Sequence, residues 1–339
     1  MLLATAFCSP DADDPPGPPP DTMYHTVGNS DDVRPATTFG LALVGGGRCD
    51  EAYRWLIQRS GGGDFVVLTT AVYSEQEDEQ YFADMKKLGA VDSITTLTVN
   101  SRAKANGSEV ENAIRNAELL FIDGGDQSEY YDMWQGTRLQ AAVQQLLQGK
   151  KVPLGGTSAG MAVLCGLAYI PLNLGVTSTQ ALADPFHANM NSLKNDFFTV
   201  PHLNGTITDT HWSERNRCGR TIAFLARAIT DGLVPFPSAR AIACDESTAV
   251  CIDDQAQAVV FGRDEADDFA YFISCRSVPD RCLPGLPLHW PEAVRVWKMR
   301  GNEAGANRFD LVTWQAWGGT LHDVNVEDGV LSVDIQTPF

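Results

Sequence analysis

The sequence predicts an α/β protein in which a mainly parallel sheet lies between two layers of helices, followed by a β-rich extension. Between residues 38 and 157, five short apolar runs alternate with stretches that have helical spacing. Runs without polar alternation are typical of strands buried on both faces of a parallel sheet. After residue 239 the chain consists mainly of short β-like runs separated by turn residues, which indicates antiparallel hairpins.

Each expected element of the parallel part follows from its local pattern. The strands are FGLALVGG (39–46), DFVVLTTA (64–71), SITTLTV (93–99), ELLFI (118–122) and KVPLGG (151–156). The helices between them span 50–60, 75–90, 108–117 and 130–149. Glycine turns follow several of these strands, and in open α/β sheets ligands bind at this carboxyl edge.

The later part of the chain is less regular. The stretch 212–230 has helical spacing, with Ser213 as its N-cap candidate and an apolar face along one side. The β-like runs that follow are 240–246, 248–253, 256–262, 268–274, 293–299, 308–314 and 329–335. We therefore divide the chain into a leader and linker (1–35), an α/β domain (36–254) and a β-rich extension (255–339) packed on that domain.

Composition excludes several classes of function. Apolar residues make up 44% of the chain, which is typical of a globular protein. The formal net charge is −18, and such a field repels nucleic acid and anionic membranes while it favours a cationic ligand. The sequence has no apolar run long enough to span a bilayer.

The first 35 residues and the cysteines give indications of the cellular location of the protein. MLLATAFCSPD begins with a short apolar stretch that lacks a basic residue, so it is interpreted as the remnant of a signal peptide. The stretch rich in Pro and Asp that follows, to about Pro35, is expected to be a disordered linker. Among the eight cysteines, the pairs Cys244–Cys251 and Cys275–Cys282 are each spaced for a disulfide, with buried free thiols as the equal alternative. A secreted or periplasmic location is favoured, and a cytoplasmic one is the alternative.

Ser158 has glycine or alanine residues close to it on both sides. Gly156-Thr157-Ser158-Ala159-Gly160 satisfies the G-x-S-x-G pattern between a strand and a helix, the arrangement of a nucleophile elbow. The Ala159 N–H at the start of the helix would then be available to an oxyanion. The alternative is an ordinary tight turn, because the pattern by itself is common.

A second turn, FIDGGDQ, ends the neighbouring expected strand. Gly125 and Asp126 could supply another N–H to an oxyanion hole, and Gln127 could hydrogen-bond a substrate carbonyl or carboxylate. The alternative is a βα turn with Asp126 as the helix N-cap.

A third group lies in ITDTHWSERNRCGR. His211 has the pKa that suits a general base for Ser158. The arginines Arg215, Arg217 and Arg220 follow it, and guanidinium groups bind carboxylates in a bidentate way. They cannot all face one pocket from a single straight helix, so part of 211–217 is expected to be a loop. The alternative is a helix with a solvated basic face.

In their order and spacing these three groups resemble the cyanophycinase family of serine peptidases, which are relatives of peptidase E. The resemblance runs from about residue 38 to residue 252. It implies a flavodoxin-like fold of the class I glutamine-amidotransferase kind and hydrolysis of cyanophycin, an aspartate polymer with arginine on each side chain, to β-aspartyl-arginine. No cofactor or metal is implied, and a homodimer remains open.

Carried over residue by residue, the resemblance implies that Ser158 is the nucleophile and His211 the base. The acid that orients the histidine is Glu246 in CDESTA, with Asp209 and Asp245 as alternatives. Positions that match the family's pocket are Gln127, Asp209, Thr210, Arg215, Arg217 and Arg220. The family commonly has Gln where this chain has Thr210, which leaves the substrate open. The rival hypotheses are a dipeptidase of the peptidase E type, an α/β-hydrolase esterase using His289 or His322, and an inactive binding protein.

Overall fold

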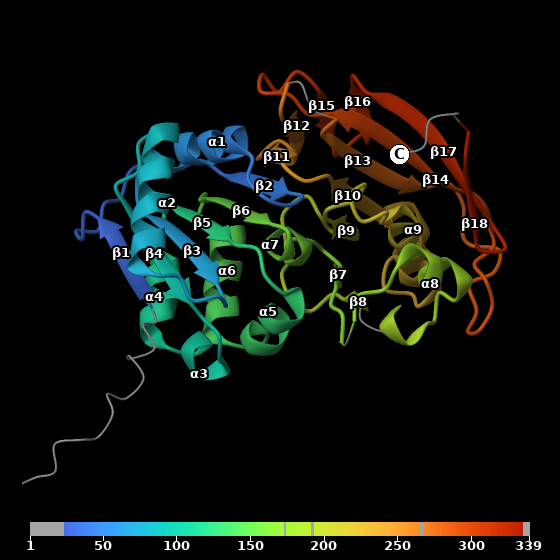
Figure 1. Cartoon of the computed structure of the whole chain (residues 1–339), viewed down its shortest axis with the longest axis horizontal. Coiled ribbons are helices and arrows are strands. Elements are labelled where there is room, and N and C mark those ends of the chain that lie inside the picture. The colour runs from blue at the N-terminus through green and yellow to red at the C-terminus, as the bar shows by residue number, and fades with distance from the viewer. Residues whose placement is uncertain (1–23, 173, 191–192, 265–266, 335–339) are drawn as a thin grey trace, which may run out of the picture.

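A computed structural model describes residues 24–172, 174–190, 193–264 and 267–334. The described part contains a ten-stranded sheet in the order β1-β4-β3-β5-β6-β2-β11-β12-β15-β16 and a six-stranded sheet in the order β18-β17-β14-β13-β10-β9 (Figure 1). A third, two-stranded sheet joins β7 and β8.

Five parallel strands form the centre of the larger sheet. They are β2 (Gly40–Val44), β3 (Phe65–Thr69), β4 (Ser93–Thr98), β5 (Leu119–Ile122) and β6 (Pro153–Thr157). All four pairings between them are parallel. Nearly every residue in them is buried, as continuous apolar runs predict.

Helices cover both faces of this centre. On one face the buried side chains of α1 (Asp50–Ser60) and α2 (Glu75–Leu88) belong to the same core as Ala42 and Val44. On the other face those of α4 (Ser108–Asn116), α5 (Gln127–Trp134) and α6 (Arg138–Gln148) belong to the same core as Leu41 and Leu43, with the short α3 (Arg102–Ala105) beside these helices. Alternate side chains of a strand therefore enter two separate cores. The predicted α/β class with three layers is confirmed.

The expected long helix over 130–149 is wrong, because α5 and α6 are separate helices. Gly136 adopts a positive φ of 71°, and Thr137 caps α6 by accepting a hydrogen bond from Gln140 N–H. A glycine in the left-handed region followed by a threonine cap ends one helix and begins the next.

The segment after Ser158 crosses to the second sheet. Its elements are α7 (Ala159–Val163), β7 (Ala168–Tyr169), α8 (Ser178–Ala183), η1 (Ala188–Met190), β8 (Leu193–Lys194), β9 (Thr206–Asp209), α9 (Cys218–Thr230) and η2 (Phe236–Ser238). Helix α9 begins at Cys218, so Ser213 is not its N-cap. Asn216 has a φ of 48°, and Ser213 N–H instead donates to Asp245, so residues 213–217 form a turn.

The C-terminal strands are divided between the two sheets. Strands β10 (Arg240–Cys244), β13 (Phe269–Cys275), β14 (Trp290–Arg300), β17 (Thr320–Glu327) and β18 (Val330–Val333) join β9 in the second sheet. Strands β11 (Ala249–Asp253), β12 (Gln257–Phe261), β15 (Arg308–Asp310) and β16 (Gln315–Trp317) continue the first sheet from β2. The β-rich C-terminal part is confirmed, although β16 and β17 were not among the expected runs. The division at residue 254 falls between β11 and β12, which pair with each other.

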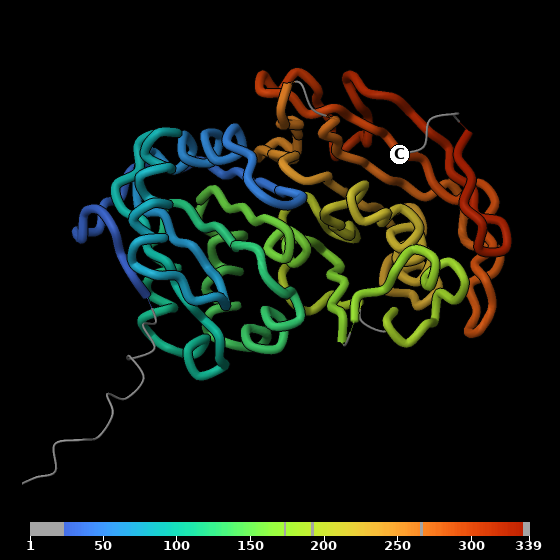
Figure 2. Tube along the Cα trace, viewed as in Figure 1, coloured from blue at the N-terminus to red at the C-terminus, as the bar shows by residue number. Residues whose placement is uncertain are grey.

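The two ends of the described chain lie far apart, with the N-terminal strand on the left of Figure 2 and the red C-terminal segment on the right. The expected linker to Pro35 is wrong for β1 (Tyr24–Gly28), which pairs with β4. Its aromatic and β-branched residues suit an edge strand. The expected signal remnant falls in residues 1–23, outside the described residues. No described helix is long and apolar enough to cross a membrane.

Of the two alternatives for the cysteines, free thiols rather than disulfides are found: seven cysteines of the described residues are free. Cys244 lies on β10 and Cys251 on β11, which belong to different sheets. Burial raises the pKa of the Cys275 thiol to about 12 and also raises that of Cys282.

Candidate active site

Ser158 occupies a strained turn between β6 and α7. Its backbone has φ 51° and ψ −114°, and its N–H donates to the Val44 carbonyl at 3.0 Å. Non-glycine residues are rarely found with positive φ, and such strain is concentrated at functional sites. A Cβ on Gly156 would lie 2.6 Å from the Gly160 carbonyl carbon, and one on Gly160 would collide with the Ile122 carbonyl oxygen. The small residues are needed because backbone packs directly on backbone beneath the serine.

Ser158, His211 and Glu246 form a hydrogen-bonded chain. Ser158 Oγ lies 2.7 Å from His211 Nε2, and His211 Nδ1 lies 2.5 Å from Glu246 Oε1. The serine follows β6, while the histidine and the glutamate follow the neighbouring parallel strands β9 and β10. Three strand ends therefore bring together residues that are up to 88 positions apart in the sequence.

The two alternative acids have other partners. Asp209 accepts hydrogen bonds from Arg220, and its Oδ2 accepts one from Thr221 Oγ1 at 2.7 Å. Asp245 accepts from Ser213 N–H at 2.9 Å and from the Tyr271 hydroxyl at 3.0 Å. Of the three carboxylates that the sequence offered, Glu246 is the one hydrogen-bonded to the histidine.

The glycine turn after β2 holds the histidine. His211 adopts φ 44°, and its N–H donates to the Gly45 carbonyl at 2.9 Å. A Cβ on Gly46 would lie 2.6 Å from His211 Nδ1, so the imidazole packs directly on the backbone of this glycine. The sequence reasoning treated this turn only as the end of a strand. Three consecutive glycines, Gly45 to Gly47, were the signal that could have identified it.

The surroundings favour the neutral form of His211. Burial lowers the pKa of the imidazole below its ordinary 6.5, and the positive charges of Arg215 and Arg217 lower it further. The hydrogen bond and charge of Glu246 oppose both effects without overcoming them. A histidine that is neutral near pH 7 and hydrogen-bonded to a hydroxyl has the properties of a general base.

Glu214 is a further member of the site that sequence reasoning missed. One of its carboxylate oxygens accepts a hydrogen bond of 2.8 Å from the backbone N–H of Glu246. The Glu246 side chain is 47% exposed, so it has little packing of its own to hold it. Glu214 therefore restrains the backbone of the residue that orients the histidine.

The turn from Asp123 to Asp126 lies beside the nucleophile. A Cβ on Gly124 would be 3.7 Å from Ser158 Cβ. The Tyr130 hydroxyl donates to the carbonyls of Asp123 and Gly124, with both oxygens at 2.9 Å. Asp123 accepts from Gly124 N–H at 2.8 Å and from the Tyr73 hydroxyl at 2.6 Å.

These contacts reduce the choice of oxyanion donors. Because Gly124 N–H is bonded to Asp123, the expected donors in this turn are the N–H groups of Gly125 and Asp126. Ala159 N–H, in the first turn of α7, has no acceptor within its helix. Asp126 also caps α5, since its side chain accepts from Ser128 N–H at 2.8 Å.

The three arginines differ in their environment. Arg220 is buried, and its guanidinium donates two hydrogen bonds to the Asp209 carboxylate. Arg217 is partly buried and donates to Thr210 O at 2.7 Å and Thr210 Oγ1 at 2.9 Å. Arg215 is exposed. Arg217 also forms an ion pair with Asp209, at 3.5 Å, so two of the arginines share one acid. The charges of Arg215 and Arg217 both act on His211.

Charge pairing explains the pKa values in this cluster. Burial favours the neutral form of Asp209, but the charge and hydrogen bonds of Arg220, the charge of Arg217 and the hydrogen bond of Thr221 outweigh it and lower the pKa of the carboxyl. Burial lowers the pKa of Arg217 to about 10 despite Asp209. Gln127 makes only a long hydrogen bond of 3.5 Å, from its amide to the Tyr169 carbonyl.

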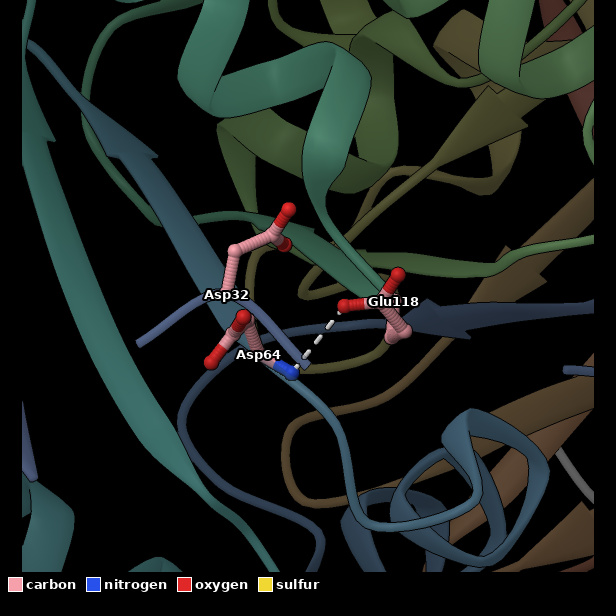
Figure 3. A group of neighbouring side chains, drawn as sticks. All are labelled: Asp32, Asp64 and Glu118. Carbon is pink, nitrogen blue, oxygen red and sulfur yellow. Dashed lines mark hydrogen bonds between the residues drawn. The ribbon is translucent and has the colours of Figure 1, made fainter. Parts of the chain in front are cut away.

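Three carboxylates form a separate acidic cluster in the described part of the chain. Asp32, Asp64 and Glu118 have carboxylate oxygens within 4.8 Å of one another (Figure 3). Glu118 accepts from Asp64 N–H and pairs with Lys150, both at 3.3 Å. Asp64 and Glu118 precede β3 and β5, so the cluster lies at the amino edge of the parallel sheet, away from Ser158. Protein partners account for its charges, and we assign it no role.

Comparison with known proteins agrees with the motifs. The model of peptidase family S51 matches residues 41–257, which is more than half of the chain. A cyanophycinase from Nostoc sp. (strain PCC 7120) is 24% identical over 251 residues, which cover 71% of this chain and 78% of that protein. A cyanophycinase from Synechococcus elongatus is 26% identical over 232 residues, 66% of each chain.

A solved structure of a peptidase from an acI-B1 Actinobacterium is also similar. It has 20% identity and a TM-score of 0.48, and the match covers 78% of this chain and 96% of that one. The family match includes Ser158, His211 and Glu246 and nearly coincides with the region in which the motifs were found. The chain belongs to peptidase family S51, a family of serine-type peptidases, and is a peptidase of the cyanophycinase and peptidase E kind.

Proposed function

We propose that this peptidase hydrolyses cyanophycin, or short β-aspartyl peptides derived from it, through an acyl-enzyme intermediate on Ser158. The observation that carries the proposal is the continuous hydrogen-bonded chain from Ser158 through His211 to Glu246. The names of the curated relatives support the substrate, and the residues around the site support the chemistry.

In the first step Ser158 Oγ attacks the amide carbon while His211 Nε2 takes the hydroxyl proton. The carbonyl oxygen becomes an oxyanion, which Ala159 N–H and an N–H of the Gly125–Asp126 turn stabilise. The C–N bond then breaks, and Nε2 delivers its proton to the leaving amine. Glu246 holds the ring with Nδ1–H toward its carboxylate and stabilises the imidazolium that forms in between.

In the second step water hydrolyses the ester on Ser158. His211 Nε2 takes a proton from the water as its oxygen attacks the acyl carbon, and the same N–H groups stabilise the second oxyanion. Collapse of this intermediate breaks the ester bond and returns the proton to Ser158 Oγ. The lowered pKa of His211 supports both proton abstractions near neutral pH.

Substrate recognition rests on charge. Arg215 and Arg217 contribute positive charge close to His211, which supports binding of the free carboxylates of the polymer, those of its arginine residues. The net charge of −18 attracts a polymer rich in guanidinium groups. Thr210 accepts a hydrogen bond from Arg217, so the position where the family commonly has Gln orients an arginine here.

A specific contact argues against one rival hypothesis, and an assay distinguishes the second. An esterase of the α/β-hydrolase type requires His289 or His322 as the base, but the histidine in contact with Ser158 is His211. His289 instead lies near Asp328, with Nδ1 3.4 Å from its carboxylate. A dipeptidase of the peptidase E type differs in the length of its substrate and is distinguished by assay.

The proposal is tested by incubating the protein with insoluble cyanophycin and identifying the products by mass spectrometry. Release of β-aspartyl-arginine by the wild type, and none by Ser158→Ala, supports it. Hydrolysis of aspartyl dipeptides without release from the polymer would favour the dipeptidase. Release by Ser158→Ala within about tenfold of the wild-type rate, a change of ~1.4 kcal/mol in the barrier, would exclude Ser158 as nucleophile.

A further inference from the structure

A pocket of about 350 Å³ opens at the start of β10 in the β-rich part of the chain. Its walls include Arg240, Ser274, Arg295, Trp297, Trp314 and Gln315. No residue that lines it in the described part of the chain is acidic, although the protein as a whole carries a net charge of −18. Arg295 pairs with Asp323, with its Nε 3.0 Å from the carboxylate, so the uncompensated positive charge in the pocket wall is that of Arg240.

Arg240 is partly buried, and no acidic counterion lies beside it in the described part of the chain. One of its terminal nitrogens donates to the Leu311 carbonyl at 3.1 Å, and its guanidinium carbon lies 4.3 Å from the centre of the Trp314 ring. It forms no ion pair with a carboxylate among the residues that the structure describes, and burial alone lowers its pKa. A guanidinium withdrawn from water with part of its donor set unused is suited to bind an anion from solution.

Trp314 fixes the position of that guanidinium at a cost in backbone strain. It ends the four-residue turn between β15 and β16 with a φ of 56°, a conformation that normally favours glycine. Its side chain is 8% exposed and packs edge-on against Phe309, and its indole nitrogen has no acceptor among the described residues. Aromatic packing explains the burial of this ring, but it explains neither the unused N–H nor the uncompensated charge stacked on it.

The pocket is remote from Ser158. Arg240 is the first residue of β10, whereas Glu246 lies six residues further on, beyond the other end of that strand. At about 3.3 Å per residue, the two are separated by roughly 15–20 Å. The neighbouring parallel strand β9 leads to His211 at the same end as Glu246. A ligand in the pocket therefore does not take part in the chemistry at the serine.

We propose that this pocket binds a carboxylate group, with the Arg240 guanidinium as its main partner. A carboxylate matches the planar pair of N–H groups that a guanidinium presents. As the source of this group we infer the free carboxylates that the arginine residues of cyanophycin carry, so that a long chain is held at a second point while one end is cleaved. That part of the inference rests on the proposed function, whereas the carboxylate pocket itself does not.

The pocket is tested with succinate as the probe, using the tryptophan fluorescence of the full-length protein. Arg240→Gln removes the charge, and Ser274→Asp places a carboxylate opposite Arg240, because these two residues pair across β10 and β13. Both variants should weaken succinate binding by at least about tenfold, the minimum for loss of a charge-assisted contact. Arg308→Gln is the matched control, since Arg308 is an exposed arginine on β15 outside the pocket, and it should bind as the wild type does.

Two results would overturn the carboxylate pocket: no saturable binding of succinate by the wild type, or binding by Arg240→Gln and Ser274→Asp that is as tight as that of the wild type. Ser274→Asp leaves Arg240 and Trp314 in place, so its result stands even if Arg240→Gln fails to fold. Thermal unfolding of each variant identifies such a failure.

The source of the carboxylate is tested by sedimentation with insoluble cyanophycin in the Ser158→Ala background. Loss of co-sedimentation on adding Ser274→Asp, but not on adding Arg308→Gln, supports the polymer as ligand. Unchanged co-sedimentation together with succinate binding would exclude the polymer and assign the pocket to a small free carboxylate. Failure of the wild type to degrade cyanophycin would refute the proposed function and leave the succinate result intact.

Discussion

Replacing Glu246 by glutamine measures what its charge contributes to the His211 base. Glu246 Oε1 lies 2.5 Å from His211 Nδ1 and raises the pKa of the imidazole against the larger effect of burial. A hydrogen bond to a charged group contributes about 1.5–3 kcal/mol. Because the Glu246 side chain is 47% exposed, solvent screening favours the lower figure. The amide keeps a neutral hydrogen bond, so the expected loss is about 1.4 kcal/mol, or about tenfold in kcat/KM at its plateau.

The same change has a defined sign in the pH profile. Hydrolysis requires neutral His211, so activity is lost as the pH falls through the pKa of this residue, which lies below 6.5 in the wild type. Without the negative charge of Glu246, which raises the pKa of His211 in the wild type, that pKa falls further. The acidic limb of kcat/KM should therefore move to lower pH in Glu246→Gln while the plateau drops.

The assay is the initial rate of β-aspartyl-arginine release at low substrate between pH 4 and pH 8. Asp245→Asn is the matched control, because Asp245 precedes Glu246 and accepts hydrogen bonds from Ser213 and Tyr271 rather than from the histidine. It should lower stability without moving the acidic limb. An acidic limb that stays in place or moves to higher pH in Glu246→Gln would refute the role assigned to this carboxylate.

Three further predictions concern the same site and its support. Ser158→Ala and His211→Ala should each abolish hydrolysis, and the double variant should be no worse than either, since the pair acts as a unit; additive losses in single-turnover rates would contradict this. Gly46→Ala should lower kcat far more than it raises KM, because a Cβ 2.6 Å from His211 Nδ1 displaces the ring; a wild-type kcat would show that the close contact is unimportant. Asp209→Asn should destabilise the fold by about 3–5 kcal/mol, because it leaves Arg220 buried without its counterion. Since the folded-state pKa of Asp209 is lowered, the stability it contributes is present above pH 3.8 and lost as the pH falls below that value; an unchanged midpoint in urea at pH 7 would contradict the prediction.

Features that depend on neighbouring residues in the chain were predictable from the sequence. Continuous apolar runs are buried on both faces wherever they occur, so β2 to β6 were recognised with near-correct bounds. The elbow at Ser158 was recognised because close approach of backbone requires glycine and alanine within two residues of the serine. The helix over 130–149 was misread because Gly136 and Thr137, taken singly, are tolerated inside helices, and only their combined conformation ends one.

Features that depend on contacts between distant residues required the tertiary structure. The sequence offered Asp209, Asp245 and Glu246 as the acid that orients the histidine. The fold places Glu246, after the end of β10, in hydrogen-bond contact with His211. Arg220 belongs to the same motif as Arg215 and Arg217, yet its position on α9 buries its side chain against Asp209.

The sequence by itself determined the fold class, the family motifs and the identity of the serine and histidine candidates, because local pattern and residue spacing carry that information. Only the tertiary structure decided which carboxylate contacts the histidine, that Glu214 and Gly46 support it, and that the C-terminal strands divide between two sheets. The physical reason is that hydrogen bonds and charge pairing act over a few ångströms in space, and the fold brings together residues whose separation along the chain gives no measure of that distance.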